Sequence, residues 1–275
     1  MQSPLIIAFV TVLSLLNGTP QVPQDPPTAP QGALQESVPA TGRDYFLFTK
    51  ALKSLRQGQL TSLVTMDIKG EGLAVVLKGQ ISLTHKTSGA YISELSVLPP
   101  LGGKPKRYKV THDGKTTWVQ DIGAGTYALQ KVTEENEFLV RGLLTGLAKT
   151  ALEKLEPSQL KFLDAPEPAP ELAVELEKAV KQGDSDIKVR DETLEGKNYR
   201  VYDLKPGKEK GVISIYVTSG HRPERLSMLL DQDKLKIKFT EVVSSLIPTI
   251  PEKTSFRFVP TRSLKKVKKI DLGNY

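Results

Sequence analysis

Residues 63–84, LVTMDIKGEGLAVVLKGQISLT, alternate apolar and polar side chains on both sides of a turn that contains two glycines. Before the turn, Val64, Met66 and Ile68 face one side of the chain, and after it a longer run of the same period begins at Leu73. Alternation with a period of two is typical of strands with one buried face, and a short loop joins antiparallel neighbours. The stretch therefore predicts a long β-hairpin.

The same alternation recurs along most of the chain and predicts two blocks of antiparallel strands. Turn residues such as Asp113-Gly114 and Gly123-Ala124-Gly125 separate neighbouring runs and keep the connections short. Beyond the hairpin, strands are predicted at 91–97, at 108–110, around Trp118, and at 127–129, 199–204, 212–217, 225–230, 235–243, 254–259 and 264–270. About eleven strands are expected, so the fold class is mainly β with some α.

Three helical segments interrupt the strands. Apolar residues recur at three- and four-residue steps from Tyr45 to Leu55, over residues 134–155 and over residues 172–180. The middle segment is predicted as one helix that ends before Pro157. Its residues Gly142, Gly146 and Thr150 line one seam, which would let the helix lie close to another surface. We expect this helix to cover the apolar face of the sheet. A solid core and a ligand cavity between helix and sheet both fit the pattern.

The first 42 residues are typical of an export signal followed by a tether. Residues 5–16, LIIAFVTVLSLL, are an uncharged apolar run of twelve. Such a run has the length of a signal-peptide core and is shorter than the roughly 20 residues that a membrane helix needs. Residues 19–42 contain six prolines and predict an extended linker. We expect a signal peptide over 1–18, a linker over 19–42, one domain over 43–275, and a periplasmic or otherwise extracytoplasmic location.

The composition excludes some chemistry and places the charge in the body of the chain. The 275 residues include no Cys, which rules out disulfides, thiolate metal sites and a lipid-modified N-terminal cysteine. The chain has 38 Lys and Arg against 31 Asp and Glu. The first base is Arg43, so residues 43–275 carry 38 bases and 29 acids, a net charge of +9. Such a body favours anionic surroundings.

No residue pattern points to catalysis, to a cofactor or to a metal. The histidines, His85, His112 and His221, are far apart and have no partner at ligand spacing. Residues 123–128, GAGTYA, match a loose dinucleotide-binding pattern, but that motif requires a helix after it and a strand is predicted there instead. The chain is therefore predicted to be a non-enzyme with no cofactor and no metal.

Several local stretches together carry a family resemblance. Residues 108–121, YKVTHDGKTTWVQD, contain a strand, an Asp-Gly turn and an aromatic strand, and residues 215–226, 236–239 and 256–260 contain later strand-like stretches. In this order they resemble the LolA/LolB-type lipoprotein-carrier superfamily, which includes RseB-like sensors. The resemblance covers about residues 43–271. It implies an open antiparallel half-barrel of about eleven strands, with helices covering the concave face.

The resemblance also implies a function. It predicts an exported, monomeric, non-enzymatic protein that holds a lipid or lipoprotein acyl chain in a hydrophobic cavity. The cavity candidates are Val75, Leu77, Ile81, Leu83, Leu95, Trp118, Leu143 and Leu147. Residues 84–91, THKTSGAY, lack the Arg-Pro pair usual in lipoprotein carriers, which counts against strict lipoprotein shuttling. The alternative is an envelope interaction or sensor module, RseB-like in fold, with a packed core and a protein partner.

The strongest charge run lies near the C-terminus. Lys265, Lys266, Lys268 and Lys269 fall within five positions. One hypothesis is a contact surface for anionic lipid headgroups or an envelope membrane. The other is an edge strand that lysines protect against pairing with another sheet. Nucleic acid is not an expected partner, because such a site would interleave aromatic residues with these bases.

Overall fold

The computed structural model describes residues 37–71, 73–100, 102–132, 134–153, 155–182, 187–205, 210–232 and 235–272. The signal peptide predicted for residues 1–18 lies outside these ranges, as does the predicted linker up to residue 36. The chain divides into two compact units. Unit 1 comprises residues 1–53 and 150–236, and unit 2 comprises residues 54–149 and 237–275.

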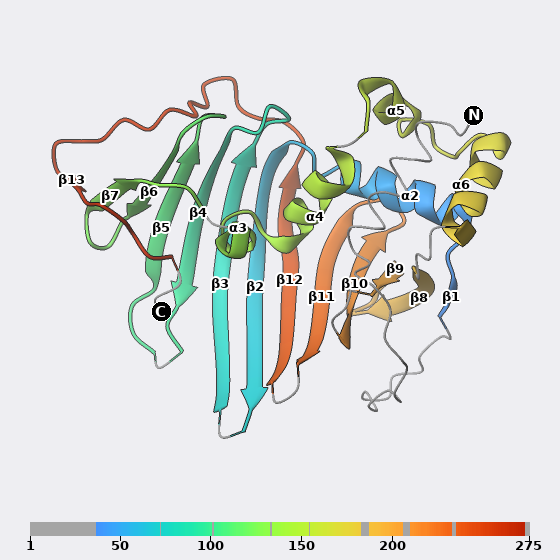
Figure 1. Ribbon diagram of the computed structural model, residues 1–275, viewed down its shortest axis with the longest axis horizontal. Coiled ribbons are helices and arrows are strands. Elements are labelled where there is room, and N and C mark those ends of the chain that lie inside the picture. The colour runs from blue at the N-terminus through green and yellow to red at the C-terminus, as the bar shows by residue number, and fades with distance from the viewer. Residues whose placement is uncertain are drawn as a thin grey trace. The chain divides into compact units, whose positions relative to one another are not determined.

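Unit 1 is built on an antiparallel sheet with the strand order β1-β8-β9-β10-β11 (Figure 1). Its strands are β1 (Val38–Pro39), β8 (Lys188–Leu194), β9 (Lys197–Leu204), β10 (Lys210–Thr218) and β11 (Pro223–Gln232). Its helices are α2 (Gly42–Lys53), α5 (Pro157–Phe162) and α6 (Pro170–Gln182). Helices α2 and α6 pack against each other.

Helix α2 begins at a reciprocal cap and packs on the sheet of unit 1. The Asp44 N–H donates to Thr41 Oγ1 at 3.2 Å, and the Thr41 N–H donates to Asp44 Oδ2 at 2.9 Å. This arrangement is a capping box, which satisfies backbone donors that the first turn would otherwise leave free. The ring of Phe48 lies 4.8 Å from the ring of Tyr202 on β9. The helix predicted from Tyr45 to Leu55 is therefore confirmed.

Unit 2 is built on a longer sheet with the strand order β12-β2-β3-β4-β5-β6-β7-β13. Neighbours from β2 to β7 are antiparallel, and β13 pairs parallel with β7. Its strands are β2 (Gly58–Gly70), β3 (Leu73–His85), β4 (Tyr91–Leu98), β5 (Lys106–His112), β6 (Thr117–Asp121), β7 (Thr126–Leu129), β12 (Leu235–Ile247) and β13 (Lys265–Lys266). Helices α3 (Glu134–Arg141) and α4 (Leu143–Leu152) follow β7, and α3 lies against β3 and β4 (Figure 1).

The predicted fold class is confirmed: the chain is mainly β with some α, on an open antiparallel sheet of the half-barrel type. The described residues form thirteen strands, compared with about eleven expected. Strand β8 escaped prediction because its sequence, KVRDETL, is mostly polar and only Val189 is fully buried. Of the helices that the structure describes, none combines the length and the hydropathy of a membrane span.

The single helix predicted over residues 134–155 is wrong, because the segment forms α3 and α4 with a break at Gly142. This glycine has a φ of +79°, a conformation that other residues rarely adopt. The carboxyl group of Glu241, on β12, occupies the space that a side chain at position 142 would need. Pro157, predicted only to end the helix, is instead the first residue of α5.

The C-terminal segment also differs from its prediction. Residues 254–259, predicted as a strand, form no strand in the structure. Phe258 instead stacks on Trp118, with 6.0 Å between the ring centres. The strand predicted over 264–270 is reduced to the two residues of β13, where Lys265 lies opposite Thr126. The segment therefore crosses the molecule as a packed extended chain.

Candidate functional site

The face of the unit 2 sheet beneath α3 is lined by apolar side chains in register. Leu77, Gly79 and Ile81 follow one another on the same face of β3. Residues directly opposite in a ladder point to the same face of the sheet. The opposite residues are Met66, Val64 and Ser62 on β2, with Val97 and Leu95 on β4 beside Gly79 and Ile81. Three successive rungs therefore form one strip, apolar except for Ser62.

A small cavity lies in this strip. Its volume is about 30 Å³, and a single water needs about 10 to 15 Å³ on the same measure. Apart from Lys78 the lining is apolar. We call it the apolar groove, and it consists of Val64, Met66, Leu77, Gly79, Ile81, Leu95, Val97, Leu139 of α3 and Phe239 of β12.

The apolar groove is closed at one end and partly open at the other. Ile81 and Leu95 are 1% and 2% exposed. Toward the tip of the β2–β3 hairpin, apolar side chains on the same face are only half-buried: Val64, Met66, Ile68, Val75 and Leu77. An elongated apolar ligand could therefore reach the groove from the hairpin side.

Three of the eight predicted cavity residues line the apolar groove: Leu77, Ile81 and Leu95. Val75 and Leu83 share their face of β3 but lie outside the cavity, since Val75 is nearer the hairpin tip and Leu83 is fully buried beyond Ile81. Leu143 and Leu147 are half-buried on α4 and are not among the lining residues.

Trp118 lies on the opposite face of the sheet from the groove. Its neighbour Val119 pairs with Val110, and both of these valines are completely buried. Trp118 pairs with Thr111 instead and stacks on Phe258. Successive residues of a strand face opposite sides of the sheet. Val119 lies on the groove face of β6, so the neighbouring Trp118 does not.

Six groove residues were missing from the predicted set: Val64, Met66, Gly79, Val97, Leu139 and Phe239. The alternation that places Val64 and Met66 on one face of β2 is visible in the sequence, and so is the apolar stripe that contains Leu139. These three could have been found. Phe239 comes from the second block of strands, and no local pattern relates it to β2 or β3.

Helix α3 is held on the sheet by a buried arginine. The guanidinium carbon of Arg141 lies 4.0 Å from the ring centre of Tyr91, a cation–π contact, and Arg141 is 6% exposed. Its Nη2 also donates to the Gly89 carbonyl at 3.4 Å. One residue earlier on α3, the Val140 carbonyl accepts a hydrogen bond from the Ser93 hydroxyl. These polar contacts fix the end of α3 on the sheet.

His85 lies near this arginine and is also buried. Burial lowers the pKa of His85 to about 4, and the positive charge of Arg141 acts in the same direction. The imidazole is therefore neutral at physiological pH and adds no charge beneath α3.

Glu241 is a fully buried carboxyl group at the start of α4. Its Oε2 accepts the Leu144 N–H at 3.1 Å. Burial raises its pKa, although the N–H groups of Leu144 and Leu143 and the hydroxyl of Ser62 favour the charged form. The group caps α4 from a strand that lies 97 positions away in the sequence. It fixes the position of the break at Gly142 and so the end of α3.

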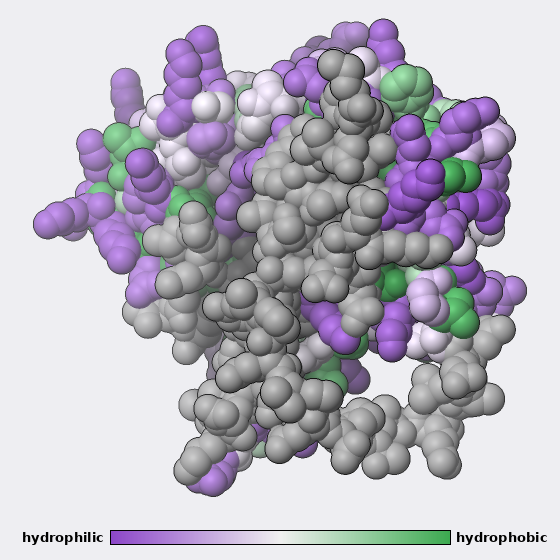
Figure 2. Space-filling model, turned by 45° about the vertical axis from the view of Figure 1, so that its right-hand side comes forward, coloured by the Kyte–Doolittle hydropathy of each residue, from purple (hydrophilic) through white to green (hydrophobic). Residues whose placement is uncertain are grey.

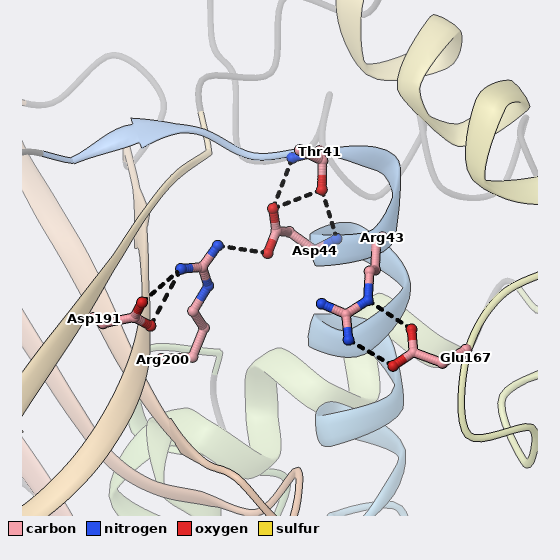
Figure 3. A network of polar contacts seen from close by, with 6 residues as sticks. All are labelled: Thr41, Arg43, Asp44, Glu167, Asp191 and Arg200. Carbon is pink, nitrogen blue, oxygen red and sulfur yellow. Dashed lines mark hydrogen bonds and ion pairs between the residues drawn. The ribbon is translucent and has the colours of Figure 1, made fainter.

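Unit 1 contains a different kind of polar cluster (Figure 3). Arg200 on β9 donates to Asp44 Oδ1 at 2.9 Å and to both carboxylate oxygens of Asp191, at 3.1 and 3.2 Å. Burial alone would raise the pKa of Asp44, but hydrogen bonds from Thr41 and Arg200 outweigh it and hold the pKa below its usual value. On the exposed side of α2, Arg43 pairs with Glu167. Each member has a partner, so the cluster is typical of helix capping rather than catalysis.

The remaining described surface is strongly charged. Within the described ranges, no group of three or more histidine and acidic side chains could hold a metal ion. On the face drawn in Figure 2, hydrophilic residues dominate the described surface and hydrophobic ones form small separate patches. Lys265 and Lys266 form β13 at the end of the strand order, and they are exposed, as are Lys268 and Lys269.

The sequence matches no protein-family model and no curated protein. The fold is similar to several solved structures. A domain assigned to outer-membrane lipoprotein sorting, from Vibrio parahaemolyticus, is 9% identical, with 72% of this chain and 90% of that chain covered and a TM-score of 0.30. LprF from Mycobacterium bovis is 12% identical, with 76% and 96% covered and a TM-score of 0.34. The Pseudomonas aeruginosa MucA/MucB complex gives 12% identity, 78% and 60% covered and a TM-score of 0.33. The likeness to these structures concerns the fold alone.

Proposed function

We propose that the protein is an exported, non-enzymatic binding protein that holds the acyl chain of a lipid or lipoprotein in the apolar groove of unit 2. The observation that carries this proposal is the apolar strip beneath α3, which is buried at Ile81 and half-buried toward the hairpin tip. Sites for apolar ligands are concave and mostly apolar with few polar groups. The groove has that character.

The size of the cavity requires α3 to move when a chain binds. About 30 Å³ is far below the several hundred Å³ of a ligand site. Helix α3 has only eight residues, ends at Arg141 just before Gly142, and contributes Leu139 to the lining. Burying one methylene contributes about 0.8 kcal/mol, so ten would contribute about 8 kcal/mol. That gain can outweigh the few polar contacts that hold the helix.

A packed core with a protein partner is the second candidate. It is supported by the small cavity volume, since the side chains beneath α3 already fill most of the space. In this case the half-buried strip along the hairpin would receive apolar side chains of a partner protein and α3 would stay in place.

Bound lipid decides between the two candidates. The purified protein is extracted with organic solvent and its lipids are quantified by mass spectrometry, then compared with those of the double variant Met66→Glu/Leu77→Glu. Both residues are half-buried on the groove face, so carboxylates there should prevent acyl-chain binding without unfolding the sheet. The matched control is Leu63→Glu/Val76→Glu, which places two carboxylates on the opposite face of the same strands, at side chains that are 52% and 46% exposed.

Lipid in near-stoichiometric amount in the native protein and the control, and its loss in the groove variant, would support the acyl-chain proposal. Absence of lipid in the native protein, together with recovery of one protein partner that the groove variant no longer binds, would support the second candidate. Lipid retained equally by both variants would contradict a site in the groove.

A further inference from the structure

Residues 248–272 leave β12 and run to the far end of the unit 2 sheet, and we call them the C-terminal strap (Figure 1). The strap contains seven basic residues and two acidic ones, and all nine side chains are exposed. The bases are Lys253, Arg257, Arg262, Lys265, Lys266, Lys268 and Lys269. Unit 2 as a whole has 20 Lys and Arg against 11 Asp and Glu, a net charge of +9, and the strap supplies +5 of it.

Aromatic packing and backbone hydrogen bonds hold the strap in place. Phe258 stacks on Trp118 and lies 5.2 Å from the ring of Tyr127. The Ile270 N–H donates to Gln130 Oε1 at 2.7 Å, and Gln130 Nε2 donates back to the Ile270 carbonyl at 2.8 Å. The bases are therefore displayed on a fixed backbone, which lowers the entropy lost when they bind a partner.

Within the described ranges these bases form no internal ion pairs. Among the described residues none of the seven has an acidic partner, whereas the arginines Arg43, Arg190 and Arg200 of unit 1 are all paired. A lysine-protected edge explains Lys265 and Lys266, which form β13. It does not explain Lys268 and Lys269, or the arginines at 257 and 262, because these lie outside any strand.

We propose that the C-terminal strap is a docking surface for membranes that contain anionic phospholipid. Exposed Lys and Arg side chains near a membrane surface attract an anionic leaflet, each contributing separately and without a shaped pocket. Val259, two positions after Arg257, is 78% exposed, so an aliphatic group is available for the interface. The aromatic rings that a single-stranded nucleic acid would need are engaged elsewhere, since Phe256 is buried and Phe258 is stacked. The proposal goes beyond the acyl-chain site and does not require it.

Vesicle co-sedimentation tests the docking surface. Purified protein is titrated with vesicles of phosphatidylcholine and with vesicles that contain about one-third phosphatidylglycerol, at low and at physiological salt. The strap variant changes Lys265, Lys266, Lys268 and Lys269 to Gln. The control variant changes four exposed lysines outside the strap to Gln, which alters the net charge equally: Lys161, Lys178 and Lys188 of unit 1, and Lys236 at the start of β12.

The expected result is binding to the anionic vesicles only, weakened at least tenfold in the strap variant and less than twofold in the control. Equal weakening in both variants would reduce the effect to net charge and overturn the proposal. Unchanged vesicle binding by a strap variant that aggregates would show that the lysines protect an edge. Tighter binding to a single-stranded oligonucleotide than to the vesicles, at physiological salt, would overturn the choice of membrane.

Two further measurements keep the result interpretable. Thermal unfolding of each variant shows whether the fold survives, which is expected because exposed charges contribute little to stability. The lipid content of the same samples reports on the groove. Vesicle binding without co-purified lipid would support the docking surface and contradict the acyl-chain proposal. Co-purified lipid without vesicle binding would support the acyl-chain proposal and contradict the docking surface.

Discussion

Unit 1 and unit 2 both place helices against an antiparallel sheet, but they fill the helix-covered face in different ways. In unit 1, aromatic stacking of Phe48 on Tyr202 and the ion pair of Arg200 with Asp44 occupy the space under α2. In unit 2, the space under α3 holds a small apolar cavity with half-buried side chains at one end. A face packed with specific partners is typical of a structural scaffold, and an apolar face with spare space is typical of a binding site.

The charges of the two units differ as well. Unit 1 has 18 Lys and Arg against 20 Asp and Glu, a net charge of −2, whereas unit 2 has a net charge of +9. The average of +7 for the whole chain hides this asymmetry. The features proposed for lipid binding, an apolar groove and a basic strap, therefore both belong to unit 2.

The largest effect is expected from the break between α3 and α4. Gly142→Ala requires an L residue at a φ of +79° and a Cβ that overlaps the buried carboxyl group of Glu241. We expect a loss of about 2 to 4 kcal/mol in the free energy of unfolding, measured by urea denaturation. Gly146→Ala is the control in the same helical segment, where a Cβ would meet nothing within 4 Å. There we expect a small gain, up to about 1 kcal/mol. Equal effects at both positions would show that the break is not a constrained feature of unit 2.

A smaller effect is expected in unit 1. Asp44→Ala removes the capping box of α2 and one partner of Arg200, and should cost about 1 to 2 kcal/mol. Because the pKa of Asp44 is lowered in the folded protein, its contribution is present above its unfolded value of about 3.8 and is lost as the pH falls. Denaturation at pH 3 and pH 7 should therefore show a smaller difference between variant and native protein at pH 3. If Asp44→Ala lost lipid binding, the binding would depend on unit 1 as well as on unit 2.

Much of the fold could be predicted because local patterns decide it. Period-two alternation identified β2, β3, β4 and most later strands, and three- and four-residue steps identified α2 and α6. The break at Gly142 could not be predicted, since the apolar stripe continues through it and the group that fixes the break, Glu241, lies in a distant strand. Residues 254–259 alternate like a strand, but the stacking of Phe258 on Trp118 fixes them in another way.

The candidate site could be predicted only in part for a related reason. Alternation within a strand tells which residues share a face, and Leu77 and Ile81 were placed correctly together on β3. It does not tell which face of the next strand continues the same surface. That relation depends on the register across each turn, which put Val119 rather than Trp118 on the buried face of β6.

A moderate, pH-dependent effect is expected from Glu241. Burial raises the pKa of the Glu241 carboxyl group in the folded protein. Above about pH 4.5 this group therefore ionises more readily in the unfolded chain than in the folded protein. The stability associated with the protonated form is therefore lost as the pH rises through the folded pKa. In Glu241→Gln, the free energy of unfolding should fall less than in the native protein between pH 4.5 and pH 8, and at pH 8 the variant should be at least as stable. A parallel pH dependence in both proteins would contradict this account, and the corresponding profile of Asp44→Ala provides the contrast from unit 1.

The smallest effect concerns the fluorescence of Trp118, the single tryptophan of the chain. Because its indole lies on the face opposite the apolar groove and stacks on Phe258 of the strap, a fatty acid in the groove should leave its emission unchanged, whereas anionic vesicles should shift it. The matched reporter is Leu139→Trp in a Trp118→Phe background, which places an indole in the groove lining. Its emission should shift to shorter wavelength and saturate as fatty acid is added, because binding removes water from the ring. If instead fatty acid gives a saturable shift in the emission of Trp118 and none in the Leu139→Trp reporter, the acyl chain binds away from α3. The acyl-chain site of unit 2 would then lie on the face of Trp118 and the strap, and not in the apolar groove.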